Sequence, residues 1–328
     1  MKKKIALVTG GTSGEAVISY KTAKTISTHL SRDQYDVYTI DITNQGWFYT
    51  DDAGAKQTVD KNDFSLTLNG TKIQFDAAFI ALHGTPGEDG KLQGYFDMIG
   101  LPYTSCNAAT SAITFNKRYT VAVAAFAGIK VANSVHLFKH IPVDANSIHL
   151  KFPVFVKPNN GGSSIGMSKV NRKEDLADAI AKAFKEDDQV LVEEMIEGRE
   201  FTIGVFRSGD DIIALPMTEV KAHDDKDFFD FEAKYQGKSD EVTPAVASET
   251  HYKNVADAAK KIYSVFNCRG VIRIDFIYNE AEQAPYMLEI NSIPGQSDAS
   301  IVPQQVRAYG WTLEQFYSAL VEDAINNH

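Results

Sequence analysis

The sequence has little cysteine and no long run of apolar residues. Only Cys106 and Cys268 occur among 328 residues, too few and too far apart for a disulfide scaffold or a CxxC metal site. Such scarcity favours a reducing, cytoplasmic compartment. No apolar run approaches the ~18 residues of a membrane span, and the basic start 1–4 is followed by an apolar stretch shorter than the ~7–15 residues of a signal peptide. We therefore expect an unexported protein without a membrane segment.

An excess of positive charge is also missing. Lys and Arg number 33 against 43 Asp and Glu, which gives a formal net charge of −10. No overall basic field exists to hold nucleic acid or an anionic membrane, so a polyanion such as ATP would need a local basic pocket. The hydrophobic fraction of 44% is too high for a disordered chain, and the length allows two or three domains.

Predicted strands and helices alternate along the chain, which indicates a mixed α/β fold. In the first hundred residues the alternation is typical of a parallel sheet with crossover helices, and Asn69-Gly70 marks a hairpin. The predicted strands are 4–8, 35–42, 77–82, 154–157, 189–196, 200–206, 271–278 and 286–290. The predicted helices are 19–30, 107–127, 173–185, 252–266 and 312–324.

Changes of character near residues 101 and 188 divide the chain into three α/β or α+β lobes. We expect an N-terminal substrate-binding domain at 1–101 and two further lobes at 102–188 and 189–328. Within the last lobe, residues 223–244 mix charges, glycine and aromatics without a period. A segment of that length inside a compact chain is predicted to be a lid.

Two glycine-rich turns follow predicted strands. Gly10–Gly14 lacks the Gly-x-Gly of a dinucleotide fingerprint, so a tight turn with backbone N–H groups facing a pocket is the better interpretation. Next to it, Glu15 either favours the helix dipole or binds an amine. The second turn, 161–166, has the spacing of a phosphate loop but is followed by Met167 instead of lysine. It is either a phosphate clamp assisted by Lys157 or a surface hairpin.

Charged side chains share one face of two late strands. Alternate residues of a strand point the same way, which pairs Arg273 with Asp275 and Glu289 with Asn291. Oxygen ligands of this kind suit Mg²⁺, and a salt bridge from Arg273 to one acid is the alternative. His83 begins a glycine-rich loop that follows a strand at the expected ligand edge of the first sheet, where either a binding loop or a plain surface loop would fit.

Taken in order, these segments resemble the D-alanine–D-alanine ligases of the ATP-grasp superfamily. The resemblance covers nearly the whole chain and implies an ATP-grasp fold with an N-terminal Rossmann-like parallel-sheet domain. The matching segments are 10–15, 83–94, 157–170, 231–235 and 288–295. The implied reaction uses ATP to phosphorylate one D-alanine, whose acylphosphate is attacked by the amine of a second to give D-alanyl-D-alanine for peptidoglycan synthesis.

The resemblance also implies roles for individual residues. ATP would contact Lys117, Lys157, Ser164, Glu193, Glu194, Ile196 and Glu200, and two Mg²⁺ ions (or Mn²⁺) would bind Asp275, Glu289 and Asn291. Arg273 and the N–H of Gly295 would stabilise the tetrahedral intermediate. The first D-alanine would meet Glu15 and His83, with Ser163 and Tyr235 completing a triad with Glu15, and the second would meet Lys234, Ser300 and Ile301. A homodimer is expected from the resemblance alone.

Three other functions compete with this one. A Rossmann oxidoreductase would explain the first glycine turn and Asp41, but it leaves the charged strand faces unexplained. A non-catalytic ATP-binding module would not need Lys157, Arg273, Asp275 and Glu289 together. A ligase that joins D-alanine to D-lactate or D-serine is the alternative within the superfamily.

Overall fold

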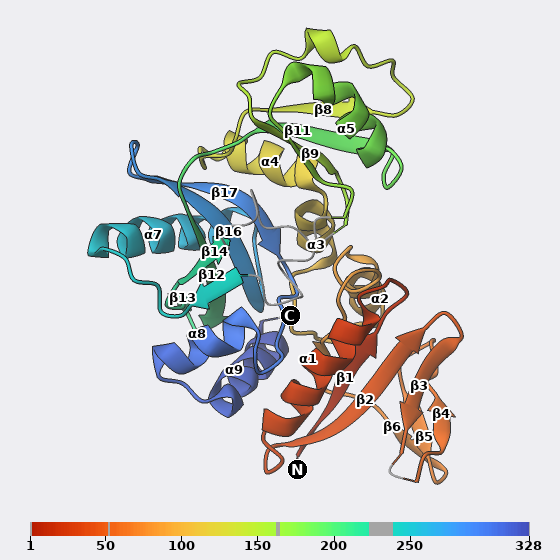
Figure 1. The fold of residues 1–328 in the computed structure, drawn as a ribbon. Coiled ribbons are helices and arrows are strands. Elements are labelled where there is room, and N and C mark those ends of the chain that lie inside the picture. The colour runs from red at the N-terminus through yellow and green to blue at the C-terminus, as the bar shows by residue number, and fades with distance from the viewer. Residues whose placement is uncertain (1, 52, 162–164, 223–238, 328) are drawn as a thin grey trace.

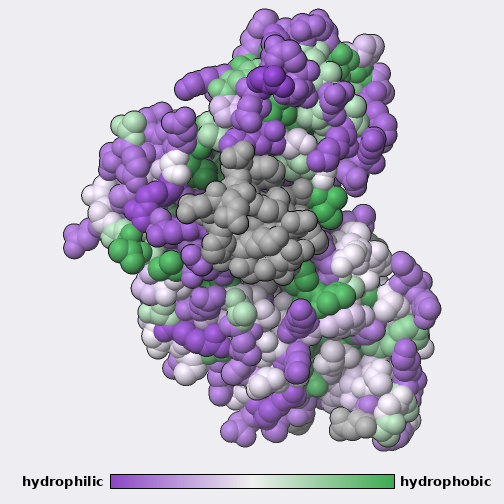
Figure 2. Space-filling model, viewed as in Figure 1, coloured by the Kyte–Doolittle hydropathy of each residue, from purple (hydrophilic) through white to green (hydrophobic). Residues whose placement is uncertain are grey.

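The computed structural model describes residues 2–51, 53–161, 165–222 and 239–327. It contains three larger sheets, each covered by helices, and Figure 1 shows the first sheet and the second at opposite ends with the third beside them. The visible face is mainly hydrophilic, with apolar side chains in scattered spots (Figure 2). Within the described residues, no helix has the length and apolar character needed to cross a membrane.

The first sheet confirms the predicted parallel arrangement and extends it. Strand β1 runs parallel to β2 and β7, and the antiparallel β3 and β4, which the sequence pattern missed, add an edge. Asn69 and Gly70 both have positive φ, at 50° and 75°, as the predicted hairpin turn requires. The elements are β1 (Lys3–Gly10), α1 (Ala16–His29), β2 (Tyr35–Thr43), β3 (Gly46–Thr50), β4 (Lys56–Thr58), β5 (Leu66–Leu68), β6 (Thr71–Ile73), β7 (Ala77–Ile80) and α2 (Lys91–Ile99).

The predicted helix 107–127 is two helices. Asn116 is extended, with φ −97° and ψ 104°, and its side chain caps the second helix by accepting the N–H of Tyr119 at 3.1 Å. An asparagine that caps in this way begins a new helix. The two are α3 (Ala108–Phe115) and α4 (Lys117–Phe126).

The second sheet is antiparallel, in the order β10-β9-β11-β8, and α5 packs its apolar side chains against it. Strand β11 begins at Gln189, where the predicted third lobe starts, yet it pairs with β8 and β9. The predicted bounds 102–188 therefore separate this strand from its hydrogen-bonded partners. The elements are β8 (Ser134–Phe138), β9 (Val154–Pro158), β10 (Ser168–Val170), α5 (Leu176–Ala183) and β11 (Gln189–Glu194), with short 3₁₀ turns at Ala145–Ser147 and Lys173–Asp175.

The third sheet has the order β15-β14-β12-β16-β17, with β13 beside β12. Part of the predicted lid belongs to it: residues 223–238 lie outside the described residues, but Ser239–Val242 form an edge strand paired with β14, so this part is regular. The elements are β12 (Arg199–Ser208), β13 (Asp211–Ala214), β14 (Thr218–Ala222), β15 (Ser239–Val242), α7 (Glu249–Val265), β16 (Val271–Asn279), β17 (Ala284–Asn291), α8 (Ile301–Tyr309) and α9 (Leu313–Asn326).

Helix α9 joins the first sheet to the third. Its buried Phe316 and Leu320 share one apolar core with Leu7 and Phe79 of the first sheet and Phe206 of the third. Helix α7 covers the other core of the third sheet, where the two cysteines are buried and free. Because residues from both ends of the chain share a core, the loops that follow β1, β7 and β17 are held close together.

Candidate active site

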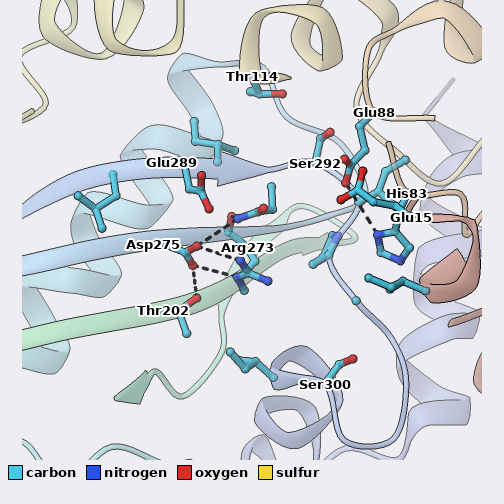
Figure 3. Close-up of a pocket in the computed structure, with 18 of the residues that line it drawn as sticks. Glu15, His83, Glu88, Thr114, Thr202, Arg273, Asp275, Glu289, Ser292 and Ser300 are labelled. Carbon is cyan, nitrogen blue, oxygen red and sulfur yellow. Dashed lines mark hydrogen bonds and ion pairs between the residues drawn. The ribbon is translucent and has the colours of Figure 1, made fainter. Parts of the chain in front are cut away.

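A cavity of about 370 Å³ lies where the first sheet, α3 and α4, and the third sheet meet. It collects predicted residues from segments far apart in the sequence, and Figure 3 shows several of them around it. The predicted residues that line it are Glu15, His83, Lys117, Glu200, Arg273, Asp275, Glu289, Asn291, Gly295, Ser300 and Ile301.

The strand pair β16 and β17 supplies the charged wall of this cavity. Arg273 lies opposite Asn291 and Asp275 lies opposite Glu289 in the antiparallel register. Directly opposed residues have their Cβ atoms ~5 Å apart on one face, so the predicted alternation brings all four together. We call these four residues the β16–β17 face.

Hydrogen bonds fix Asp275 within this face. Its carboxylate accepts from Arg273 Nε at 2.9 Å and Nη2 at 2.8 Å, and from Asn291 Nδ2 at 3.3 Å. Thr202 Oγ1 on β12 donates to it as well (Figure 3). The salt bridge considered from the sequence is therefore present.

The carboxylates on this face stabilise the charged form of Arg273. Burial works to lower the pKa of the Arg273 guanidinium, but the neighbouring Asp275 and Glu289 carboxylates outweigh it and raise that pKa. Two carboxylates and an amide oxygen, with a cationic neighbour, form an oxygen-only donor set that fits Mg²⁺ shared with phosphate groups. Within the described residues, no group of three or more His, Cys, Asp or Glu side chains is arranged to hold a metal ion.

The N-terminal edge of the cavity is formed by the start of α1 and the loop after β7. His83 is buried, and its Nε2 lies 3.0 Å from Thr22 Oγ1 while its Nδ1 lies 3.9 Å from Glu88 Oε1. Gly84, at φ +70°, lets this loop approach Glu15: a Cβ there would lie 2.6 Å from Glu15 Oε2 and 2.5 Å from Ser13 Oγ. The binding-loop interpretation of this segment fits its burial better than a plain surface loop.

Two predicted ATP-binding lysines lie at the start of α4 and on β9 of the second sheet. Lys117 lines the cavity and donates to the carbonyl of Gly161 at 2.7 Å. Lys157 is paired with Glu193, and both side chains are nearly buried. Neither residue of that pair lines the cavity in this structure.

The predicted ATP contacts Glu194 and Ile196 do not line the cavity. The Glu194 carboxylate accepts hydrogen bonds from the N–H of Lys151 at 2.8 Å and from Asn133 Nδ2 at 3.0 Å, and so connects the chain around these two residues to β11. Ile196 is half-buried just after β11 and is not part of the cavity lining. The predicted Ser163, Ser164, Lys234 and Tyr235 lie outside the described residues.

Several cavity residues were not predicted from the sequence. Thr202 shares a strand face with Glu200, so the same alternation that marked Arg273 and Asp275 could have indicated it. Glu88 stands in the loop after His83, but its contact with the His83 ring depends on how that loop folds back. The unpredicted polar or charged lining residues are Lys21, Glu88, Thr114, Thr120, Thr202, Glu241, Ser292 and Ser297.

Comparison with known proteins assigns both parts of the chain. The family model described as D-ala D-ala ligase N-terminus matches residues 4–106, and that described as D-ala D-ala ligase C-terminus matches residues 115–322. The D-alanine–D-alanine ligase of Parabacteroides distasonis is 43% identical and covers 100% of this chain and 99% of its own.

Solved structures agree over the same length. The VanG D-Ala:D-Ser ligase of Enterococcus faecalis superposes with a TM-score of 0.85 at 29% identity, covering 99% of both chains. The D-alanine–D-alanine ligase of Bacillus anthracis complexed with ATP gives 0.79 at 25% identity, covering 99% of this chain and 98% of that one. The expected ATP-grasp architecture is confirmed, and the chain belongs to the D-alanine–D-alanine ligase family.

Proposed function

We propose that this chain is an ADP-forming ligase that joins two D-alanines to D-alanyl-D-alanine for peptidoglycan precursor synthesis. The observation that carries the proposal is the β16–β17 face, with its two carboxylates, amide and guanidinium, in one cavity with Glu15 and Ser300. ATP activates the first carboxylate as an acylphosphate, and the second amine displaces phosphate. ADP release that depends on D-alanine tests this, and a chain stabilised by NADH but not by Mg·ATP would point to the oxidoreductase instead.

The β16–β17 face would serve the phosphoryl step. Asp275, Glu289 and Asn291 would hold two Mg²⁺ ions, or Mn²⁺, which supply positive charge to the β- and γ-phosphates when bound. Arg273, raised in pKa by its carboxylate neighbours, stays a cation at any working pH and would stabilise the developing oxyanion together with the N–H of Gly295. Lys117, Lys157 and Glu200 would contact the phosphates and ribose of ATP, with Ser164, Glu193, Glu194 and Ile196 in the remaining nucleotide contacts.

The two D-alanines would bind in the cavity next to this face. Glu15 would hold the ammonium of the first, next to His83, with Ser163 and Tyr235 as hydrogen-bonding partners. Lys234 and Ser300, with Ile301 beside them, would bind the carboxylate of the second. Glu15 and Ser300 both line the cavity, which supports a common site for the two substrates.

The choice of second substrate would separate this ligase from superfamily members that use D-lactate or D-serine. D-Alanine must lose a proton from its ammonium group to attack, whereas D-lactate offers a neutral hydroxyl, so a cationic lid residue would favour lactate. The predicted lid carries Tyr235, whose phenol is neutral near pH 7, within 232–235. His223 precedes this motif by several residues in the sequence. With D-alanine and D-lactate in competition, we expect dipeptide as the main product at pH 6 and pH 8; mostly D-alanyl-D-lactate at pH 6 would contradict this. Adding D-serine to the competition tests the activity named for the VanG relative.

The assembly and location follow the same proposal. A homodimer rests on the family resemblance, and light scattering of the purified chain would test it. A cytoplasmic site is expected because the reaction consumes ATP and the sequence has only two cysteines, both free in the fold.

A further inference from the structure

Thr22 contacts both the N-terminal and the C-terminal parts of the site with one hydroxyl group. It lies on α1 and is 1% exposed. Its Oγ1 is 3.0 Å from His83 Nε2 and accepts the backbone N–H of Gln296 at 3.3 Å. Gln296 directly follows Gly295, whose N–H is proposed to face the oxyanion.

Only one assignment of donors and acceptors is consistent with these contacts. A backbone N–H can only donate, so Gln296 uses a lone pair of the Thr22 oxygen and leaves the Thr22 proton free for another acceptor. The Glu88 carboxylate faces His83 Nδ1 at 3.9 Å and would repel a lone pair there, so the proton of a neutral ring belongs on Nδ1. The lone pair is then on Nε2, where it accepts the hydroxyl proton of Thr22.

Each side of the site has further hydrogen bonds of its own, and the Thr22 hydroxyl connects the two sides. Ser19 Oγ accepts the N–H of His83 at 2.9 Å, and Glu88 Oε2 accepts the N–H of Gly84 at 3.1 Å. On the other side, Gln296 Oε1 accepts from Tyr317 at 3.4 Å. His83 therefore has its Nε2 within hydrogen-bond distance of Thr22 and its Nδ1 facing Glu88, which orients the ring beside the first-substrate part of the site.

We propose that Thr22 is a positioning residue that holds His83 in its Nδ1–H tautomer and aligns the first-substrate side of the site with the loop that carries Gly295. This rests on the proposed ligase function. Thr22→Val keeps the shape of the side chain and removes its hydroxyl, which leaves the Gln296 N–H without its acceptor and His83 Nε2 without its donor. Thr22→Ser keeps the hydroxyl.

The test combines kinetics with the nitrogen spectrum of the His83 ring. In Thr22→Val we expect kcat to fall about tenfold or more, with the KM for ATP within twofold of the starting protein. Long-range ¹H–¹⁵N spectra should show a single Nδ1–H tautomer in the starting protein and a mixture in Thr22→Val, with the signals assigned by their loss in His83→Gln. Thr22→Ser should restore both measurements.

Thr25→Val is the matched control. Thr25 is also buried on α1, at 7% exposure, and within the described residues its side chain hydrogen-bonds to neither His83 nor Gln296. It should leave the His83 spectrum unchanged. A folded Thr22→Val with kcat within twofold and an unchanged tautomer would overturn the proposal, as would an Nε2–H tautomer in the starting protein. If the starting protein releases no ADP with D-alanine, the ligase function fails, while the spectrum still decides whether Thr22 sets the ring.

Discussion

The two walls of the cavity are built in different ways. On the β16–β17 face, strand register alone places Arg273, Asp275 and Glu289 on a common surface. At the N-terminal edge, Glu15 stands at a helix start and His83 in a loop, so their positions depend on individual contacts with side chains and backbone groups. A substitution on the strand face should therefore remove one functional group and leave the positions of the others unchanged. A substitution at the loop edge should instead displace functional groups that are still present.

The largest effect is expected from Asp275→Asn. The variant keeps the strand register but loses a carboxylate proposed to bind metal, so kcat should fall by at least about 10³-fold. The variant should still fold, although its melting temperature should drop because the largely buried Arg273 loses its ion pair. Asp175→Asn, which affects an exposed pair with Arg172, serves as control and should keep full activity. Near-normal kcat for Asp275→Asn at saturating Mg²⁺ would mean that the metal assignment is wrong.

Lys157→Met tests a group outside both walls, the ion pair between Lys157 and Glu193 on the second sheet. Loss of the cation should raise the KM for ATP about 10- to 100-fold, and the buried Glu193 carboxylate left unpaired should cost roughly 3 kcal/mol of stability. Adding Glu193→Gln should recover much of the melting temperature without recovering the KM. If the double variant regained both, Lys157 would be structural only.

Gly84→Ala tests the loop edge. Its Cβ would collide with Glu15 and Ser13, so the KM for the first D-alanine should rise about tenfold while ATP binding is unaffected. Gly100→Ala provides the comparison, since Gly100 has nearly the same φ, +68° against +70°, with no atom within 4 Å of the added Cβ. Both variants carry a backbone strain of about 1–2 kcal/mol. Equal kinetics in the two variants would therefore show that the close approach of Gly84 to Glu15 does not matter for binding the first D-alanine.

The smallest effect concerns stability away from the cavity. Burial, and then the hydrogen bond to Glu322, raise the pKa of Tyr35 to about 12. Its neutral form therefore stabilises the fold fully below pH 10, and this contribution is lost as the pH rises from 10 to 12. Tyr35→Phe should cost about 1 kcal/mol at pH 7 in a urea titration. The gap between the two proteins should narrow between pH 10 and 12, and a constant gap would contradict the assignment.

The same contrast explains how far the sequence predicts the molecule. Period-two alternation suffices for Arg273, Asp275, Glu289 and Asn291, because register converts spacing into proximity. It says nothing of Glu88 or Thr22, whose partners lie 5 and 61 residues away and meet only after the loop has folded onto α1. The sequence pattern does not predict the break of helix 107–127 at Asn116, because it does not distinguish an asparagine that caps a helix from one inside a helix. Edge strands such as β15 are also not predicted, because their side chains are packed too little to show a hydrophobic pattern.

Helix α9 has a consequence for how the chain folds during synthesis. Domains usually fold in the order in which they leave the ribosome, N-terminal first. Here Leu7 and Phe79 of the first sheet are covered by Phe316 and Leu320, which are translated more than two hundred residues later. Helix α1 supplies Ala23 and Ile26 to the same core, but the part of this apolar face that packs on α9 has no cover until α9 is made. Chaperones therefore have their longest opportunity to bind at the part of the protein that is made first.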